Sequence, residues 1–169
     1  MNHFDHHNFL VDYQHGFRKQ RSCETQLVVT IEELARSVDN KQQTDLLILD
    51  FSKAFDTVAH QRLLLKLEHY GIRGNLLKWV KNWLTVRSQK VMVDGEISSD
   101  VFVKSGVPQG TVLGPLMFLI LVNDIGQNIT SKLRLFADDT LLYREIKSQE
   151  DAHLLQENLT KLEEWTKQW

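Results

Sequence analysis

Residues 132–144, KLRLFADDTLLYR, place two adjacent aspartates between two short, mostly apolar stretches. Such stretches on either side of a polar centre are typical of β-strands, so the pattern predicts a hairpin with Ala137, Asp138 and Asp139 at its turn. Carboxylates in apolar surroundings are costly unless they are paired or bind a cation. The turn therefore indicates a fold in which other polar groups, or a metal ion, meet this acidic pair.

A third aspartate, Asp50, lies near the end of DLLILDF at 45–51, a run that predicts a strand buried on both faces. Asp50 is distant from Asp138 in the chain, so only the fold can bring them together. If it does, three carboxylates converge at one sheet edge, with those of Asp50 and Asp138 on the order of 3–6 Å apart. Oxygen ligands suit Mg²⁺, and two such ions can clamp the attacking and leaving oxygens of a phosphoryl transfer.

Each part of this pattern also has a purely structural interpretation. An Asp-Asp pair in a hairpin is commonly turn chemistry, and an aspartate that closes a strand commonly caps a helix. Asp56 is a weaker metal candidate, because KAFDTVAH is typical of a helical turn in which it caps or pairs locally. Periodicity alone leaves these alternatives open.

The remaining chain predicts helices and a second hairpin. Ser22 can cap a helix that runs to about Val38, and Asp94-Gly95 is a strong type I′ turn signal within 90–104. Further helices are expected at 60–70, at 76–86, from about 113, and after the capping-box pattern Ser148-x-x-Asp151. The order predicts one α+β domain, an antiparallel sheet with helices packed on one face.

Composition excludes some classes of protein. The chain is 42% hydrophobic and 25% charged, as in ordinary globular domains, and lacks a signal peptide or an apolar run long enough to span a bilayer. One cysteine cannot form an internal disulfide, so a cytoplasmic or nuclear location is expected. A net charge of −2 counts against strong nucleic-acid binding by this chain alone.

Four stretches in order resemble the reverse transcriptases of non-LTR retrotransposons, jockey-like and CR1-like elements in particular. YQHGFRKQRSCETQL resembles the segment before motif A, and LDFSKAFDTVAH, SGVPQGTVLGPLMFLILVNDI and LRLFADDTLLY resemble motifs A, B and C. The resemblance implies a reverse transcriptase palm and RNA-directed DNA polymerase activity. It also implies two Mg²⁺ ions, with Mn²⁺ as a substitute, and an RNA template, a DNA primer and dNTPs as partners.

The resemblance also implies roles for individual residues at the metal centre. Asp50 and Asp138 would be the metal-binding catalytic aspartates, and Asp139 would assist them. The carbonyl of Phe51 would be a further metal ligand.

Other residues would contact the substrates. Phe55 matches the aromatic steric gate, where a bulky ring leaves no room for a 2′-hydroxyl, although a core aromatic is the alternative. Gln109 would contact the nucleotide or template at the nascent pair, and Gly106 and Gly110 would let backbone approach substrate. Arg18 would reach the nucleic acid or anchor the helix after it.

By the same resemblance, residues 1–169 are a partial domain: the palm with the end of the fingers region, without most of the fingers or the thumb. The isolated chain is therefore expected to be inactive and to leave apolar surface uncovered, including Trp165 and Trp169. Alternatives are a non-enzymatic retroelement remnant or a domesticated palm that binds RNA or protein. A group II intron-type maturase and a phosphatase or nuclease with three carboxylates fit the motifs less well.

Overall fold

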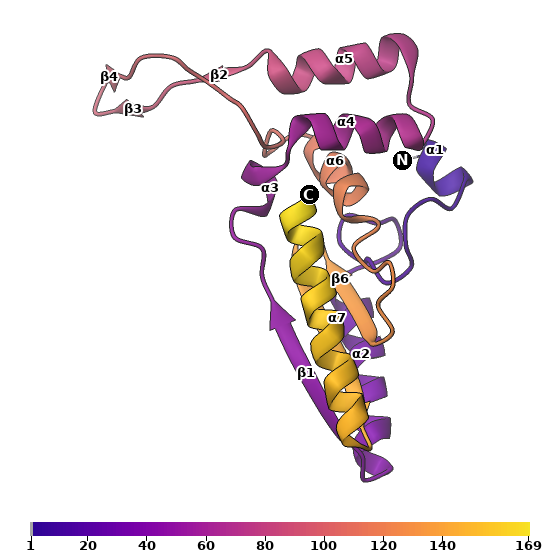
Figure 1. Ribbon diagram of the computed structural model, residues 1–169. Coiled ribbons are helices and arrows are strands. Elements are labelled where there is room, and N and C mark those ends of the chain that lie inside the picture. The colour runs from indigo at the N-terminus through magenta and orange to yellow at the C-terminus, as the bar shows by residue number, and fades with distance from the viewer. Residues whose placement is uncertain (1) are drawn as a thin grey trace. The chain divides into compact units, whose positions relative to one another are not determined.

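The protein is described by a computed structural model that covers residues 2–169, apart from the side chains of Asn2 and Asp5 (Figure 1). Its internal contacts divide the chain into two compact units. The sheet unit comprises Met1–Ser52 with Val122–Trp169, and the helical unit comprises Lys53–Leu121. The amino-acid composition does not change after Ser52 or after Leu121, where the chain passes from one unit to the other. For this reason the sequence predicts one continuous domain.

Three antiparallel strands form the framework of the sheet unit, in the order β1-β7-β6 (Figure 1). The predicted hairpin is confirmed, because β6 and β7 pair through a short turn that carries the two aspartates. The strands are β1 (Gln43–Leu49), β6 (Lys132–Phe136) and β7 (Asp139–Ile146), and the helices of this unit are α1 (Asn2–His6), α2 (Cys23–Asp39) and α7 (Gln149–Gln168).

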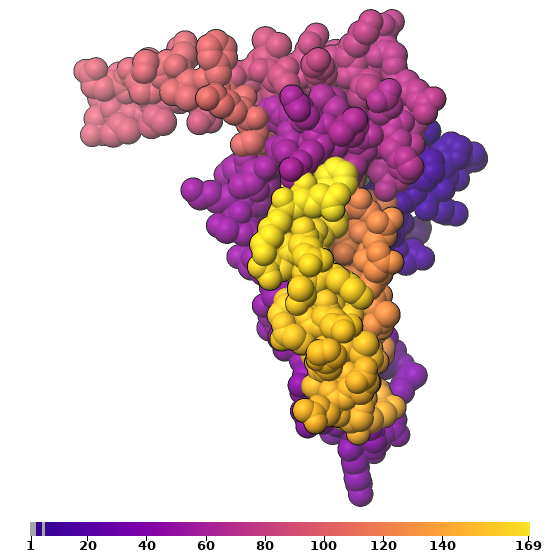
Figure 2. Space-filling view, viewed as in Figure 1, coloured from indigo at the N-terminus to yellow at the C-terminus, as the bar shows by residue number. Residues whose placement is uncertain are grey.

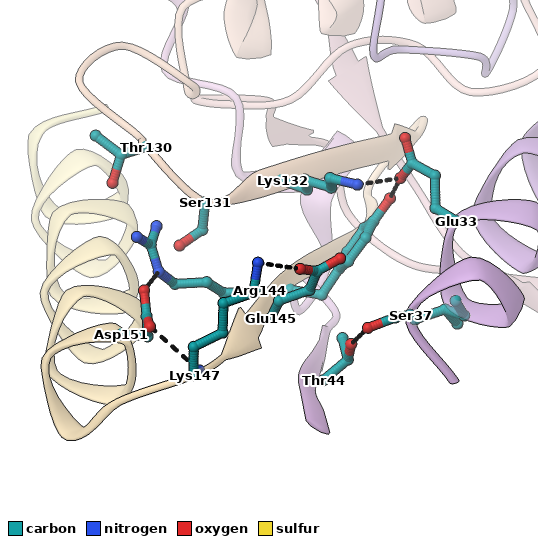
Figure 3. Close-up of a pocket in the computed structure, with 12 residues that line it drawn as sticks. Glu33, Ser37, Thr44, Thr130, Ser131, Lys132, Arg144, Glu145, Lys147 and Asp151 are labelled. Carbon is teal, nitrogen blue, oxygen red and sulfur yellow. Dashed lines mark hydrogen bonds and ion pairs between the residues drawn. The ribbon is translucent and has the colours of Figure 1, made fainter. Parts of the chain in front are cut away.

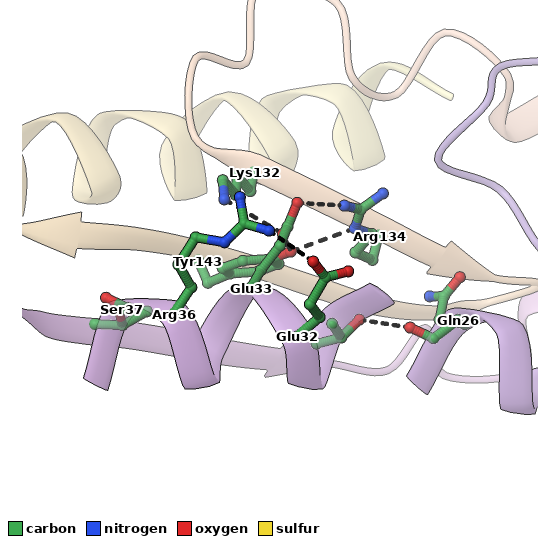
Figure 4. A network of polar contacts seen from close by, with 10 residues as sticks. Gln26, Glu32, Glu33, Arg36, Ser37, Lys132, Arg134 and Tyr143 are labelled. Atoms are coloured by element: carbon green, nitrogen blue, oxygen red, sulfur yellow. Dashed lines mark hydrogen bonds and ion pairs between the residues drawn. The ribbon is translucent and has the colours of Figure 1, made fainter. Parts of the chain in front are cut away.

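The two long helices of the sheet unit lie on opposite faces of the sheet. Leu142 of β7 packs with Leu155 and Leu162 of α7 in the hydrophobic core. The next residue, Tyr143, points to the other face, because side chains alternate along a strand, and its hydroxyl donates to Glu33 of α2. Figure 4 shows the strands between the two helices. The α+β class is therefore confirmed, but the prediction of helices on one face only is wrong.

Ion pairs between β6 and Glu33 hold helix α2 against the sheet. Arg134 donates to Glu33 at 2.9 Å, and the Lys132 ammonium lies 3.3 Å from the same carboxylate (Figure 4). Burial alone would raise the pKa of Glu33, but the hydrogen bond from Tyr143 and the charge of Arg134 outweigh it and hold that pKa below its ordinary value. Glu33 is therefore a charged anchor between helix and sheet.

The apolar stripe of α2 does not form its buried face. Ser22 caps the helix as predicted, by accepting from the backbone N–H of Thr25. The side chains that are buried are polar, Gln26, Thr30 and Ser37. The expected uncovered apolar surface is therefore present here, because Leu27, Val28, Ile31 and Val38 are all at least 57% exposed.

Strand β1 lies at an edge of the sheet, so the prediction of a strand buried on both faces is wrong. None of its residues is fully buried, and Ile48 is 77% exposed. Its apolar run is explained by one face only, where Leu47 and Leu49 pack against the core shared with α7.

Helix α7 starts where the sequence predicts but is capped differently. Asp151 accepts hydrogen bonds from the Ser148 hydroxyl and the Lys147 backbone N–H, both at 3.2 Å, so the reciprocal capping box is not formed. The helix then runs along the surface of the sheet unit (Figure 2). Trp165 is half-buried, packs against the core and donates to Asp124 at 2.9 Å, so it is only partly uncovered, as is Trp169.

The helical unit packs α4 against α5 and contains most of α6, whose residues 117–122 are all buried. The predicted turn is confirmed, since Asp94 and Gly95 both have positive φ, and its hairpin extends away from these helices with its side chains exposed (Figures 1 and 2). The elements are α3 (Ala54–Thr57), α4 (His60–His69), α5 (Gly74–Thr85), β2 (Ser88–Gln89), β3 (Met92–Val93), β4 (Glu96–Ile97), β5 (Val101–Phe102) and α6 (Leu113–Val122). Along residues 2–169 no helix has both the length and the apolar character required to cross a membrane.

Candidate active site

The acidic hairpin turn has an unusual backbone. Phe136 pairs with Asp139, so Ala137 and Asp138 alone form the loop. Ala137 has a φ of 55°, a left-handed conformation that residues with a Cβ adopt rarely. Asp138 is half-buried and Asp139 is exposed at the first position of β7. Two adjacent carboxylates are thus presented at the tip of a tight, strained turn.

Asp50 reaches the same end of the sheet. Leu49, the last residue of β1, pairs with Thr140, so Asp50 follows directly and continues toward the position of Asp139. Side chains alternate along both strands, which places Asp50 and Asp139 on the same face if the register continues by one residue. The register therefore brings Asp50 to the same end of the sheet as the turn with Asp138 and Asp139, and the convergence of the three carboxylates stays a prediction.

The donor groups at this end fit a divalent cation. Among the described residues, none of Asp50, Asp138 and Asp139 forms a salt bridge. Carboxylate oxygens are the ligands that Mg²⁺ and Mn²⁺ prefer. Within residues 2–169, however, no three His, Cys, Asp or Glu side chains form a group arranged to hold a metal ion. Asp50, Asp138 and Asp139 therefore lie at the same end of the sheet, but their side chains do not form a metal-binding group.

Phe51 follows Asp50 and packs its half-buried ring against the core of the sheet unit. This contact fixes the chain immediately after the first aspartate. A role for the Phe51 carbonyl as a metal ligand stays a prediction.

Arg18 has a structural contact within the sheet unit. Its guanidinium donates to the backbone carbonyl of Val11 at 2.9 Å, and the side chain is half-buried. Arg18 thus ties the segment before α2 to an earlier loop. Contact with nucleic acid stays a prediction.

Four predicted site residues lie in the helical unit. Phe55, in α3, is half-buried and stacks on Phe118 of α6 with ring centroids 4.5 Å apart. Phe118 therefore packs against one face of the Phe55 ring, and this contact agrees with both the core and the steric-gate interpretations. Gln109 is exposed and donates to the Asp56 carboxylate at 2.9 Å. Asp56 thus has a hydrogen-bond partner, but the partner is distant in sequence and not local as predicted.

The two glycines of the SGVPQG loop differ in their surroundings. A Cβ at Gly106 would lie 2.8 Å from the Asp56 carbonyl oxygen, and the Gly106 N–H donates to Val58 at the same distance. Gly106 therefore packs closely on the protein's own backbone, and an approach of this backbone to substrate stays a prediction. Gly110 is exposed, and a Cβ there would meet no atom within 4 Å.

A cavity of about 300 Å³ lies elsewhere in the sheet unit, between α2, the strands and the start of α7 (Figure 3). Its charged groups are already matched: Lys132 pairs with Glu33, Arg144 with Asp151 and Lys147 with Glu145 (Figure 3). Pairs neutralised in this way leave little charge for a ligand. The cavity is lined by residues that hold the sheet together, and it contains none of the three predicted catalytic aspartates.

Sequence reasoning missed two residues that touch the acidic turn. The side chain of Gln14 bonds both backbone groups of Ala137, and Gly16 lies so close that a Cβ there would be 2.2 Å from the Ala137 nitrogen. Both lie in YQHGFR, which the sequence singles out. Nothing in that stretch indicates which residues lie beside it in the fold.

The family model described as reverse transcriptase (RNA-dependent DNA polymerase) matches residues 1–169. The chain is 32% identical to the RNA-directed DNA polymerase from mobile element jockey of Drosophila funebris, and 31% identical to the probable RNA-directed DNA polymerase from transposon BS of Drosophila melanogaster. These alignments cover 93% and 95% of the chain but 18% of each relative. The chain belongs to the reverse transcriptase family.

Proposed function

We propose that this chain carries the catalytic centre of an RNA-directed DNA polymerase that adds deoxynucleotides to a primer 3′-end on an RNA template. The observation that supports the proposal is the strand register, which brings Asp50 to the end of the sheet where the hairpin turn carries Asp138 and Asp139, all without an ion-pair partner among the described residues. Family membership adds the reaction class, because the relatives are named as RNA-directed DNA polymerases.

Each residue at the metal centre has a distinct task in this proposal. Asp50 and Asp138 hold the divalent ions, the Phe51 carbonyl adds a ligand, and Asp139 supplies further negative charge beside them. Mg²⁺ held by these residues would supply positive charge to offset that of the transferring phosphoryl group. The protein's part is positioning, and no covalent nucleophile is required.

The helical unit supplies contacts to the incoming nucleotide. Phe118 supports the Phe55 ring from one side, so the opposite side can close the space below the sugar. Gln109 holds its amide at the surface through Asp56, where it can meet the nascent base pair, and Gly110 leaves open space beside it. Gly106 holds this loop against α3, and Arg18 holds the segment before α2.

The proposal is tested in a chimera, because the chain spans about a fifth of the length of the curated relatives it matches. Residues 1–169 replace the matching segment of the jockey polymerase, and this jockey chimera is assayed by primer extension on an RNA template with Mg²⁺. Template-dependent extension supports the proposal. Residues 1–169 alone are the control, and their net charge of −2 offers little attraction for phosphates.

Phe55→Val in the jockey chimera should admit ribonucleotides. Removing the ring opens space for a 2′-hydroxyl, so discrimination against ribonucleotides should fall by about 10–200-fold, the range for one changed group in an apolar pocket. Deoxynucleotide incorporation should be retained. The measurement is kcat/KM for dNTPs and rNTPs in single-nucleotide extension.

The matched control for this experiment is Phe118→Val, which removes the ring that is 2% exposed and supports Phe55. This change should lower the stability of the protein and reduce deoxynucleotide and ribonucleotide incorporation to the same extent. If Phe55→Val behaves in the same way, Phe55 is a core aromatic and not a gate.

A further inference from the structure

Gln14 makes an unusually complete contact with the acidic turn. It is buried, with 2% of its surface exposed, and its Oε1 accepts hydrogen bonds from the backbone N–H of Ala137 at 2.9 Å and of Gly16 at 2.7 Å. Its Nε2 donates to the Ala137 carbonyl at 3.1 Å. One side chain therefore satisfies both backbone polar groups of the residue that precedes Asp138.

The residue that Gln14 holds is the strained one. Ala137 has the left-handed φ of 55°, which its Cβ disfavours, and such backbone persists only where surrounding contacts impose it. A flip of the peptide on either side of Ala137 would break one of the Gln14 hydrogen bonds. The hydrogen bonds of Gln14 to Ala137 therefore help to set the backbone direction at Asp138 and Asp139.

The segment that carries Gln14 is itself fixed to β6. The Leu135 N–H donates to the Tyr13 carbonyl, and the His15 N–H donates to the Leu135 carbonyl, both at 2.8 Å. These bonds add the segment as a short parallel neighbour of β6. Gly16 allows the close approach, because a Cβ there would collide with Ala137. Gln14 is therefore a rigid support and not a side chain that happens to reach the turn.

We propose that Gln14 is a positioning residue that sets the Ala137–Asp138 turn so that Asp138 and Asp139 can hold divalent metal. The inference rests on the proposed function, since it concerns the same aspartates. It does not give Gln14 any contact with substrate or metal. Its prediction is that loss of the amide loosens the turn and weakens metal binding while the fold is retained.

The test compares Gln14→Met and Gln14→Asn with wild-type residues 1–169. Methionine keeps the length without the hydrogen-bonding groups, and asparagine keeps the amide on a shorter stem, so either variant that folds provides the test. Gln26→Met is the matched control, because Gln26 is also buried in the sheet unit and its Oε1 has no partner in the described structure. Circular dichroism melting first establishes that each variant folds.

Two further readouts separate positioning from a general loss of stability. Hydrogen exchange at the Ala137 amide, followed by NMR, should be at least about tenfold faster in the Gln14 variants and unchanged in Gln26→Met. The dissociation constant for Mn²⁺, measured by calorimetry, should rise about 10–100-fold, as for other groups that orient metal ligands. Wild-type exchange and wild-type Mn²⁺ affinity in a folded Gln14 variant would overturn the proposal.

Asp138→Asn distinguishes failure of this inference from failure of the proposed function. If Asp138→Asn weakens Mn²⁺ binding but the Gln14 variants do not, the metal site stands and the role of Gln14 is rejected. If wild type and Asp138→Asn bind Mn²⁺ equally weakly, the proposed metal site is rejected, and the role of Gln14 with it.

Discussion

Asp138→Asn should abolish primer extension by the jockey chimera, with a loss on the order of 10³-fold in kcat. Asparagine has nearly the same shape but one oxygen and no charge, so it weakens the hold on an ion that stabilises the transferring phosphoryl group. Asp138 lies in a two-residue loop at the end of the sheet and is only half-buried, so the fold should not change. Activity is measured by single-nucleotide extension and folding by thermal unfolding.

Asp94→Asn is the matched control for this prediction. Asp94 also lies in a hairpin turn and has a positive φ of 51°, but it belongs to an exposed hairpin of the helical unit. Asparagine suits the type I′ turn at this position, so neither activity nor stability should change. Loss of activity in Asp138→Asn accompanied by loss of thermal stability would indicate a structural role for Asp138. Unchanged activity would reject the catalytic assignment.

Gly106→Ala should destabilise the chain by about 2–5 kcal/mol, combining a left-handed backbone penalty with a steric clash. Gly106 has a φ of 85°, and the added Cβ would lie 2.8–3.0 Å from three backbone atoms of Asp56. A backbone cannot move aside as a flexible side chain can. The loop would have to separate from α3 and lose hydrogen bonds such as that from the Val107 N–H to Phe55. Urea denaturation measures the change in the free energy of unfolding.

Gly110→Ala separates the two contributions to this loss. Gly110 has a similar φ of 72°, but a Cβ there meets nothing within 4 Å. It should therefore lose only the backbone part, about 1–2 kcal/mol. Equal losses at the two glycines would show that close packing on Asp56 contributes nothing.

Local signals in the sequence predicted the elements well. The Ser22 cap, the Asp94-Gly95 turn and the hairpin around Asp138 and Asp139 are all specified by neighbours in the chain. Their chemistry is local, since capping and turn formation depend on a few adjacent residues. These features could therefore be read before the fold was known.

Tertiary relations could not be predicted in the same way. The run from Asp45 is apolar and predicts a buried strand, but its place at the sheet edge is set by which strands pair with β7. The apolar stripe of α2 suggested a buried face, yet Glu33 anchors the helix through partners about a hundred residues away. The contact of Gln14 with Ala137 has the same origin. Sequence periodicity does not show which residues distant in the chain contact one another.

The chemistry at the sheet end can be tested most directly by iron-mediated cleavage of residues 1–169. Fe²⁺ bound in place of Mg²⁺ generates hydroxyl radicals with peroxide and ascorbate, and these cut the nearby backbone. Mass spectrometry of the fragments should show cuts near Asp50 and near Ala137–Asp139 together, suppressed by excess Mg²⁺ and lost in Asp138→Asn. Cleavage confined to other regions, such as the histidines near the N-terminus, or cuts indifferent to Mg²⁺ and to Asp138→Asn, would contradict a shared metal site at these aspartates.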